Sequence, residues 1–310
     1  MKSILTEKLN AKYPIIQGGM ANIATAEFAA AVSLAGAIGL IGAGGWSAEK
    51  VEEEIIKIKE LVGDKPYGVN VMLMNPQAPE IMKVCIKHNV PLITTGAGNP
   101  APYVKPAHDA GMLIMPVVPN AAFAKKVEQL GVDAIIVEGT ESGGHVGEET
   151  SLVAVSNATD ICSVPIIAAG GIATAKQFAA SFVLGAQGAQ IGTVLLATEE
   201  CPIHENYKNL VIEATPGTTI VTGRKQGAPV RSIQNKMTKE YQALEQTDIT
   251  FMEIEHLTIG SLGKAVFNGD VDNGSFMAGQ VVGQVNEIKT VEQVITEIAN
   301  IKPIFDNLDI

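Results

Sequence analysis

The sequence lacks the residues that usually mark secreted or membrane-bound proteins. Its three cysteines, Cys85, Cys162 and Cys201, form no CxxC pair, which argues against a disulfide framework and a zinc cluster. Its longest apolar run, residues 29–45, is broken by glycines and is shorter than the roughly 20 residues of a membrane-spanning helix. Residues 1–14 carry charges and have no apolar core, so we expect no secretory signal. We therefore predict a soluble, cytoplasmic chain that binds no membrane.

Positive charge is also in short supply, with 22 lysines and arginines against 33 acidic residues. The resulting net charge of −11 would repel nucleic acids and anionic membranes, so we expect neither as a partner. The motifs HExxH and GxSxG are absent, and the sequence shows no Cys–His signature. Hydrolysis by zinc or by a serine nucleophile is therefore unsupported, and no metal site is predicted.

The sequence does contain short apolar runs that alternate with helix-like segments. Most runs are apolar at consecutive positions, as in parallel strands that are buried on both faces. Helical signals lie between them: Ser47 precedes an acidic first turn and an apolar stripe, and Gly131 and Gly185 stand where helices should stop. The eight predicted strands are 14–16, 37–41, 67–72, 92–95, 113–117, 134–137, 165–168 and 189–191.

Eight strands that alternate with helices predict a (β/α)8 TIM barrel. The alternative is a doubly wound open sheet, which usually has fewer strands, and no GxGxxG opens the first helix. Residues 204–262 are more polar and are interrupted by prolines and glycines. We interpret them as a small inserted lid or substrate-binding domain, so that residues 1–203 and 263–310 make up the predicted barrel.

Two glycine-containing segments follow the last two predicted strands and predict a phosphate site. The segment 168–174 ends one strand and enters a helix, and the segment 190–193 ends the next strand. Main-chain N–H groups of bare glycines can point at an anion there, and the helix dipole favours its charge. The alternative is that the glycines only make tight turns. The residues predicted to hold the phosphate are Ala169, Gly170, Gly171, Gln190, Gly192 and Thr193.

Residues after the first, third and fourth strands would meet at the same end of the barrel. The segment 17–20 has two glycines, against which a flat ring could lie, and a methionine for a soft apolar contact. Asn70 and the segment 95–100 add polar groups that could bind the heteroatoms of a flavin, although each alone is also typical of an ordinary loop. The residues predicted here are Gly18, Gly19, Met20, Asn70, Thr95 and Gly96.

His145 is the strongest candidate for a catalytic residue. It follows the sixth strand within the glycine-rich segment 137–147. An imidazole there could reach a bound ring or substrate and donate a proton near neutral pH. The alternative is an ordinary histidine of a surface loop. His88 and His108 are predicted to lie on helices away from this end of the barrel.

The segment 224–239 holds five positive charges and no acidic residue. It is either a solvated surface or a docking patch for an anionic partner or the phosphate of a dinucleotide.

The chain carries a series of motifs in a fixed order, which cover nearly its whole length: YPIIQGGM, GVNVML, TTGAGNP, EGTESGGHVG, PIIAAGGIA, QIGT and GDVDNGSFMAGQ. Together they resemble the FMN-dependent enoyl-[acyl-carrier-protein] reductase II family, called FabK, within the wider nitronate monooxygenase and 2-nitropropane dioxygenase-like group. The segments GAPVRSIQN and GDVDNGSFMAGQ point more narrowly to the reductase. Ser142 is a small departure, because the family often has alanine at that position.

The resemblance implies that the barrel binds FMN and that His145 is the active-site histidine. The implied FMN contacts are Gly18, Gly19, Met20, Asn70, Glu138, Gly143, Gly144, Gly170, Gly171, Gly192 and Thr193, with Met277 and Gly279 closing the site.

The resemblance also implies a reaction and its partners. NADH or NADPH would reduce the flavin, which would reduce a trans-2-enoyl thioester on acyl carrier protein to the acyl thioester of fatty-acid elongation. His145 would donate a proton or a hydrogen bond to the developing enolate. The basic segment 224–239 would meet the acidic carrier. The family further implies a homodimer and, in some members, a monovalent cation.

Two other functions are compatible with the same residues. A nitronate monooxygenase would use the same fold and flavin with oxygen instead of NAD(P)H, and His145 would act as a base. A non-catalytic flavin- or phosphate-binding barrel would need no reactive side chain, and His145 among glycines at the rim argues against it.

Overall fold

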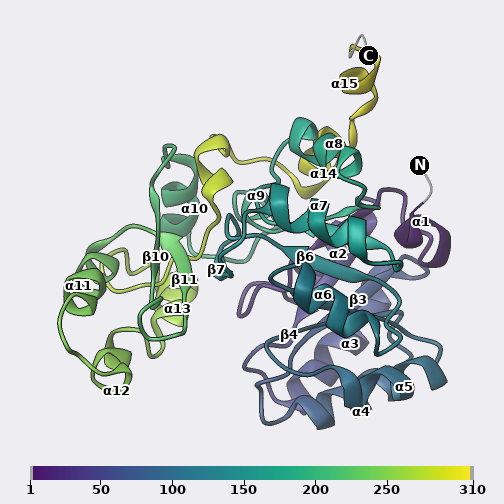
Figure 1. The fold of residues 1–310 in the computed structure, drawn as a ribbon, viewed down its shortest axis with the longest axis horizontal. Helices are drawn as coiled ribbons and strands as arrows, with labels where there is room; N and C mark the ends of the chain where they lie inside the picture. Colours follow the sequence, from purple (N-terminus) through teal and green to yellow (C-terminus); the bar gives the residue numbers. More distant parts are fainter. Residues whose placement is uncertain (1–2, 308–310) are drawn as a thin grey trace.

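The parallel strands of this chain close into a barrel (Figure 1). The structure is a computed structural model that describes residues 3–307. Its barrel strands are β1 (Ile15–Gln17), β2 (Gly39–Gly42), β3 (Tyr67–Met72), β4 (Leu92–Gly96), β5 (Leu113–Val118), β6 (Ile135–Glu138), β8 (Ile166–Ala169) and β9 (Ala189–Ile191). They pair in the order β1-β9-β8-β6-β5-β4-β3-β2, and a bridge between Ile16 and Ile38 closes the ring. The predicted (β/α)8 barrel is therefore confirmed.

Helices alternate with these strands and cover the outside of the barrel (Figure 1). Their N-termini are fixed by caps such as Ser47, Asn120 and Thr174, whose side chains accept hydrogen bonds from main-chain N–H groups of the first turn. Within residues 3–307, no helix is both long and apolar enough to cross a bilayer. The helices of this layer are α2 (Ala26–Leu34), α3 (Ala48–Val62), α4 (Ala78–Lys87), α5 (Ala101–Asp109), α6 (Ala121–Glu128), α7 (Ser151–Ile161), α8 (Ala175–Val183), α9 (Thr193–Leu196) and α14 (Val291–Ala299). The last helix, α15 (Lys302–Asp306), projects away from the barrel beyond α8 (Figure 1).

Two hydrophobic cores explain why the strands are apolar at consecutive positions. Ile16 belongs to a core inside the barrel, whereas its neighbour Ile15 belongs to the core that the strands share with the helices. Leu40 and Ile41 divide in the same way. Because successive side chains of a strand point to opposite faces, a strand that is covered on both faces needs apolar residues at every position.

The short helix α1 (Ile4–Lys8) closes the N-terminal end of the barrel. Leu5 and Leu9 belong to the inner core, and Ile4 N donates a hydrogen bond to Gln187 Oε1, two residues before β9. Burying a leucine side chain contributes about 1.5–3 kcal/mol to folding. Since hydrophobic side chains fill this end, the opposite end, where the strands reach their C-termini, is left for a ligand.

The chain between α9 and α14 forms a second unit beside the barrel, which we call the lid (Figure 1). Its elements are α10 (Glu205–Ile212), β10 (Thr219–Thr222), β11 (Val230–Ile233), α11 (Lys236–Glu245), α12 (Phe251–Ile254), α13 (Ser261–Gly263), the π-helix η2 (Lys264–Asn268) and the 3-10 helices η1 (Glu255–Leu257) and η3 (Gln280–Gln284). β11 pairs antiparallel with β10 and also with β7 (Gly144–His145), which belongs to the loop after β6. The lid sheet therefore includes the strand that carries His145.

The contacts of residues 264–276 bear on where the lid ends. His204 N donates to Val266 O at 2.9 Å, and Ile233 N donates to Phe276 O at 2.8 Å. Val266 and Phe276 are therefore hydrogen-bonded to residues of the lid. The division into residues 1–203 and 263–310 for the barrel and 204–262 for the lid stays a prediction.

Candidate active site

Loops at the C-terminal ends of four strands meet where the sequence predicts a flavin. Gly18 N donates to Ile191 O at 2.7 Å, which joins the loops after β1 and β9. Asn70 Nδ2 of β3 donates to Thr94 Oγ1 of β4 at 2.9 Å. Gly19 lies so close to Asn70 that an added Cβ would overlap the amide side chain. Position 19 therefore requires glycine, because any side chain would collide with Asn70.

Met20, Thr95 and Gly96 lie at the same end of the barrel. A Cβ added at Gly192 would lie 3.8 Å from the Met20 sulfur, so the thioether covers the main chain after β9. Thr95 and Gly96 are the last residues of β4, and a Cβ added at Gly96 would meet nothing within 4 Å. This rim position therefore opens onto free space.

The glycines after β8 present main-chain donors. Gly170 and Gly171 have φ angles of +84° and +74°, which glycine adopts without strain. Among the hydrogen bonds of residues 3–307, none uses the N–H groups of Gly170, Gly171 or Gly192. α8 starts shortly after these glycines, behind its cap Thr174. Free N–H groups at the start of a helix form a concavity that binds anions.

Several buried side-chain polar atoms have no hydrogen-bond partner among the described residues, and two of them lie next to the phosphate segments. They are Gln190 Oε1, on β9, and Ser142 Oγ, in the loop after β6. Leaving a buried polar group unsatisfied costs about 1–3 kcal/mol. A bound molecule with hydrogen-bonding groups would remove this cost, so both atoms indicate a binding site.

Glu138 ends β6 opposite Ala169, the residue before the two glycines of the phosphate segment. Burial raises the pKa of Glu138 to about 7. Near neutral pH the carboxyl group is therefore divided between its protonated and ionised forms. It can donate a hydrogen bond as well as accept one.

His145 stands on β7, opposite Val230 of β11, and its side chain is exposed. Gly144 has a φ angle of +79°, so the entry to β7 favours a residue without a Cβ. Gly143 lies against the main chain of residues 276–279, where an added Cβ would come within 2.7 Å of a carbonyl carbon. The loop with the imidazole is therefore held between the lid sheet and this returning segment.

The returning segment, residues 276–279, joins the two halves of the site. Gly279 N donates to Thr193 Oγ1, at the start of α9, at 2.8 Å. Tyr207 OH, from α10, donates to Met277 O at 2.7 Å. Met277 and Gly279 therefore lie between the phosphate segment after β9 and the loop with His145.

Arg231 and Tyr207 support the site although neither was identified from the sequence as a residue that does so. Arg231 is only 6% exposed, and its Nε donates to Thr140 O, in the loop with His145, at 3.0 Å. It belongs to the segment 224–239, which the sequence favours as a surface patch. No local signal separates this buried arginine from its exposed basic neighbours, and none marks Tyr207.

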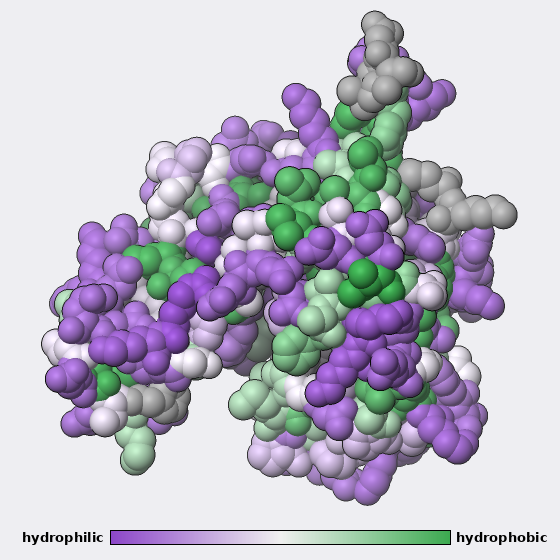
Figure 2. Space-filling view, in the orientation of Figure 1, coloured by the Kyte–Doolittle hydropathy of each residue, from purple (hydrophilic) through white to green (hydrophobic). Residues whose placement is uncertain are grey.

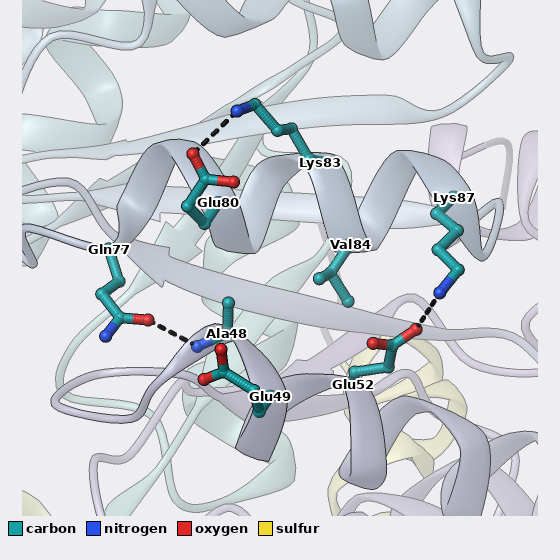
Figure 3. A pocket seen from close by; sticks show the side chains of 8 residues that line it. All are labelled: Ala48, Glu49, Glu52, Gln77, Glu80, Lys83, Val84 and Lys87. Atoms are coloured by element: carbon teal, nitrogen blue, oxygen red, sulfur yellow. Dashed lines mark hydrogen bonds and ion pairs between the residues drawn. The ribbon is translucent and has the colours of Figure 1, made fainter.

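A hollow of about 280 Å³ lies on the outer surface between α3 and α4 (Figure 3). Most of its charged side chains are paired: Glu80 with Lys83 at 2.7 Å, and Glu52 with Lys87 at 2.6 Å and with His88 at 2.7 Å. None of the predicted site residues lines it, so we assign it no function. In the described part of the chain, no group of three or more His, Cys, Asp or Glu side chains is placed to hold a metal ion. The hollow is lined by Ala48, Glu49, Glu52, Gln77, Glu80, Lys83, Val84 and Lys87.

Several known proteins are similar to this chain in sequence or in structure. The sequence model of nitronate monooxygenase matches residues 2–90 and 80–300. FabK from Thermotoga maritima superposes with a TM-score of 0.96 at 40% identity, covering 99% of this chain and 98% of that chain. A nitroalkane oxidase from Streptomyces ansochromogenes gives a TM-score of 0.87 at 25% identity, over 98% of this chain and 100% of its own. A Staphylococcus saprophyticus protein named "Probable nitronate monooxygenase" is 31% identical over 279 residues, 75% of this chain and 78% of that protein.

Proposed function

The chain belongs to the nitronate monooxygenase family, and we propose that within this family it is an FMN-dependent enoyl-[acyl-carrier-protein] reductase. The observation that carries the proposal is the likeness to FabK, which spans the whole chain at a clearly higher identity than the likeness to nitroalkane oxidase. Because both relatives share the barrel and the lid, the overall fold does not distinguish the two activities. The sequence identity, which includes the lid, favours the reductase.

The residues at the mouth of the barrel fit FMN. The unbonded N–H groups of Gly170, Gly171 and Gly192 suit its phosphate, and the unpaired Gln190 Oε1 and Ser142 Oγ would be satisfied by polar groups of the cofactor. When bound, FMN would supply hydride transfer between NADH or NADPH and the enoyl thioester. The further proposed contacts are Gly18, Gly19, Met20, Asn70, Thr95, Gly96, Glu138, Gly143, Gly144, Ala169, Thr193, Met277 and Gly279.

His145 is proposed to manage the proton of the reaction. Its exposed side chain stands at the edge of the lid sheet, where a thioester that enters from solvent can meet it. An imidazole N–H directed at the thioester carbonyl would stabilise the negative charge that develops on that oxygen. The same group would supply the proton that completes the saturated acyl product.

The experiment that tests the proposal is anaerobic mixing of the flavin-loaded protein with NADH or NADPH, followed by crotonyl-CoA or crotonyl-ACP. Flavin absorbance in the visible range is recorded throughout. We expect bleaching by one nicotinamide and recovery of colour on addition of the enoyl thioester. A flavin that neither nicotinamide bleaches would contradict the proposal.

Nitronate monooxygenase activity is the second candidate, favoured by the family match and by the Staphylococcus saprophyticus relative. In that reaction His145 would act as a base on an alkyl nitronate precursor, and oxygen would replace NAD(P)H. Bleaching by an alkyl nitronate, with colour restored by air and no response to nicotinamides, is the result that would select this function.

The expected homodimer has some support from exposed apolar side chains on the barrel helices. Leu34 of α2 is 58% exposed and Val183 of α8 is 72% exposed, and Figure 2 shows hydrophobic surface over these helices. A second copy of the chain that covered them would remove this apolar surface from water. The choice between NADH and NADPH, the monovalent cation, docking of the carrier protein on residues 224–239 and the cytoplasmic location stay predictions.

A further inference from the structure

The sequence contains only two arginines, and both reach the same loop. The other basic residues are lysines, and the arginines are Arg224 and Arg231. Arg224, between β10 and β11, donates from Nη2 to Thr140 Oγ1 at 3.2 Å. Arg231, on β11, donates from Nε to Thr140 O at 3.0 Å. The two guanidinium groups therefore meet beside Thr140, in the loop that also carries His145.

Arg231 is buried without a counter-ion. Its Nη1 donates to Thr219 Oγ1 at 3.1 Å, so both of its acceptors are neutral oxygens. Within residues 3–307, no carboxylate forms an ion pair with either arginine, and the carboxylate of nearby Glu141 is taken by Ser151 N and Oγ at 2.7 and 2.9 Å. Burial and the charge of Arg224 lower the pKa of Arg231, and the negative charge of Glu141 partly offsets this. Buried charges in proteins are ordinarily paired, so this guanidinium group lacks a directly bonded anion.

A phosphate group suits these side chains. The planar guanidinium presents paired donors that match two phosphate oxygens and keeps its charge when buried, whereas lysine loses its charge more readily. The remaining N–H donors of both arginines have no acceptor among the described residues. We propose that Arg224 and Arg231 form a subsite for the phosphate or diphosphate group of a substrate. The identity of that substrate rests on the proposed function, in which the dinucleotide and the phosphopantetheine thioester both carry such a group.

Arg231 and His145 stand on paired strands of the lid sheet, one position apart in register. Arg231 pairs with Gly144, and its neighbour Val230 pairs with His145. Successive strand residues point to opposite faces, so the arginine and the imidazole are on opposite faces of the sheet. β7 is the edge strand of the order β10-β11-β7. The proposal requires that an extended substrate anchored at the arginines passes around this edge to reach His145.

The test compares Arg224→Gln and Arg224→Lys with a matched control, Lys264→Gln, which removes one charge from an exposed position elsewhere on the lid. Arg231→Lys, which keeps the charge and much of the bulk, is added because a neutral residue at this buried position can unfold the lid. KM is measured for NADH against reduced nicotinamide riboside, and for crotonyl-CoA against crotonyl-N-acetylcysteamine. In each pair only the first compound carries phosphate.

We expect Arg224→Gln to raise KM about tenfold or more for the phosphate-bearing member of one pair, and to leave its phosphate-free partner unchanged. Arg224→Lys should raise KM less because it keeps the positive charge. The remaining increase would reflect the loss of the paired guanidinium donors. The affected pair identifies the source of the phosphate. Equal effects on both members of a pair, an equal effect of Lys264→Gln, or a loss of bound FMN in place of a KM change would overturn the subsite.

A binding measurement separates the subsite from the proposed function. Calorimetry with inorganic pyrophosphate and the flavin-loaded protein needs no turnover. Pyrophosphate that binds the wild type about tenfold more tightly than Arg224→Gln would support the subsite even if no enoyl thioester were reduced. Binding that is absent, or equal in the two proteins, would refute it.

Discussion

Gly170 offers a sharp test of the phosphate segment. Its φ angle is +84°, and a Cβ added there would lie 2.9 Å from Gly139 O and 3.0 Å from Ser151 Oγ. Gly170 O also accepts a hydrogen bond from Ser151 Oγ at 2.9 Å. Gly170→Ala therefore places a methyl group against the loop after β6 and forces one side of the proposed phosphate cradle to move.

The structure supplies a control that separates the two costs of this substitution. Gly111 has a similar φ angle of +72°, but a Cβ added there meets nothing within 4 Å. A left-handed conformation costs an alanine roughly 1–2 kcal/mol, and this cost applies to both variants. The substitution also changes the entropy of the unfolded chain by the same amount in both variants. Overpacking adds about 1–3 kcal/mol at Gly170 alone. We therefore expect the free energy of unfolding of Gly170→Ala to be about 1–3 kcal/mol lower than that of Gly111→Ala.

The assay is chemical unfolding of the flavin-free variants, together with titration of each by FMN. Gly170→Ala should bind FMN about ten- to a hundredfold more weakly, which corresponds to the loss of one hydrogen bond to a charged group. Gly111→Ala should bind FMN as the wild type does. Equal destabilisation of the two variants would refute the steric argument, and unchanged FMN affinity of Gly170→Ala would refute the role of this segment in phosphate binding.

Three further substitutions test other parts of the site. His145→Ala should lower kcat by about 10²–10⁴ and retain FMN, whereas His88→Ala should keep the wild-type rate; a full rate in His145→Ala would remove the proton role. Burial raises the pKa of Glu138 in the folded protein to about 7, above its ordinary 4.5. The protonated carboxyl group therefore contributes fully to the free energy of unfolding below pH 4.5, and this contribution is lost as the pH rises to 7. Glu138→Gln should therefore gain up to about 3 kcal/mol over the flavin-free wild type between these pH values, and parallel stability profiles would contradict the burial of a neutral acid. Tyr207→Phe should lower the free energy of unfolding by about 1 kcal/mol through loss of the bond to Met277 O, and urea titration that shows no change would exclude that contribution.

The barrel could be predicted from the sequence because its strands carry a local signal. Ile135, Ile136 and Val137 are all buried, the middle one in the inner core and its neighbours in the outer core. Such consecutive burial produces consecutive apolar residues, which can be read without knowledge of the fold. The turn at Gly170 and Gly171 could also be predicted, because glycine at the end of a strand commonly adopts the positive φ angle that both residues have.

The contacts that hold His145 in place could not be predicted in this way. Arg231 and Thr140 are 91 residues apart in sequence, and Tyr207 and Met277 are 70 residues apart. β7 has only two residues, and its pairing depends on β11 more than eighty positions later. A strand this short leaves no periodicity, and a hydrogen bond to a main-chain oxygen leaves no pattern at the accepting residue.

The site has one part that depends on local contacts within the barrel and another part that depends on distant contacts with the lid. The barrel alone provides the free N–H groups of Gly170 and Gly192, so a phosphate cradle needs no contribution from the lid. The loop with His145, by contrast, takes its position from β11, from Arg231 and from residues 276–279, all of which belong to the lid or return from it. A lid that shifted would therefore move the imidazole and the two arginines together and leave the phosphate cradle in place. It follows that substitutions in the lid should have a larger effect on substrate selectivity than on the affinity for the cofactor.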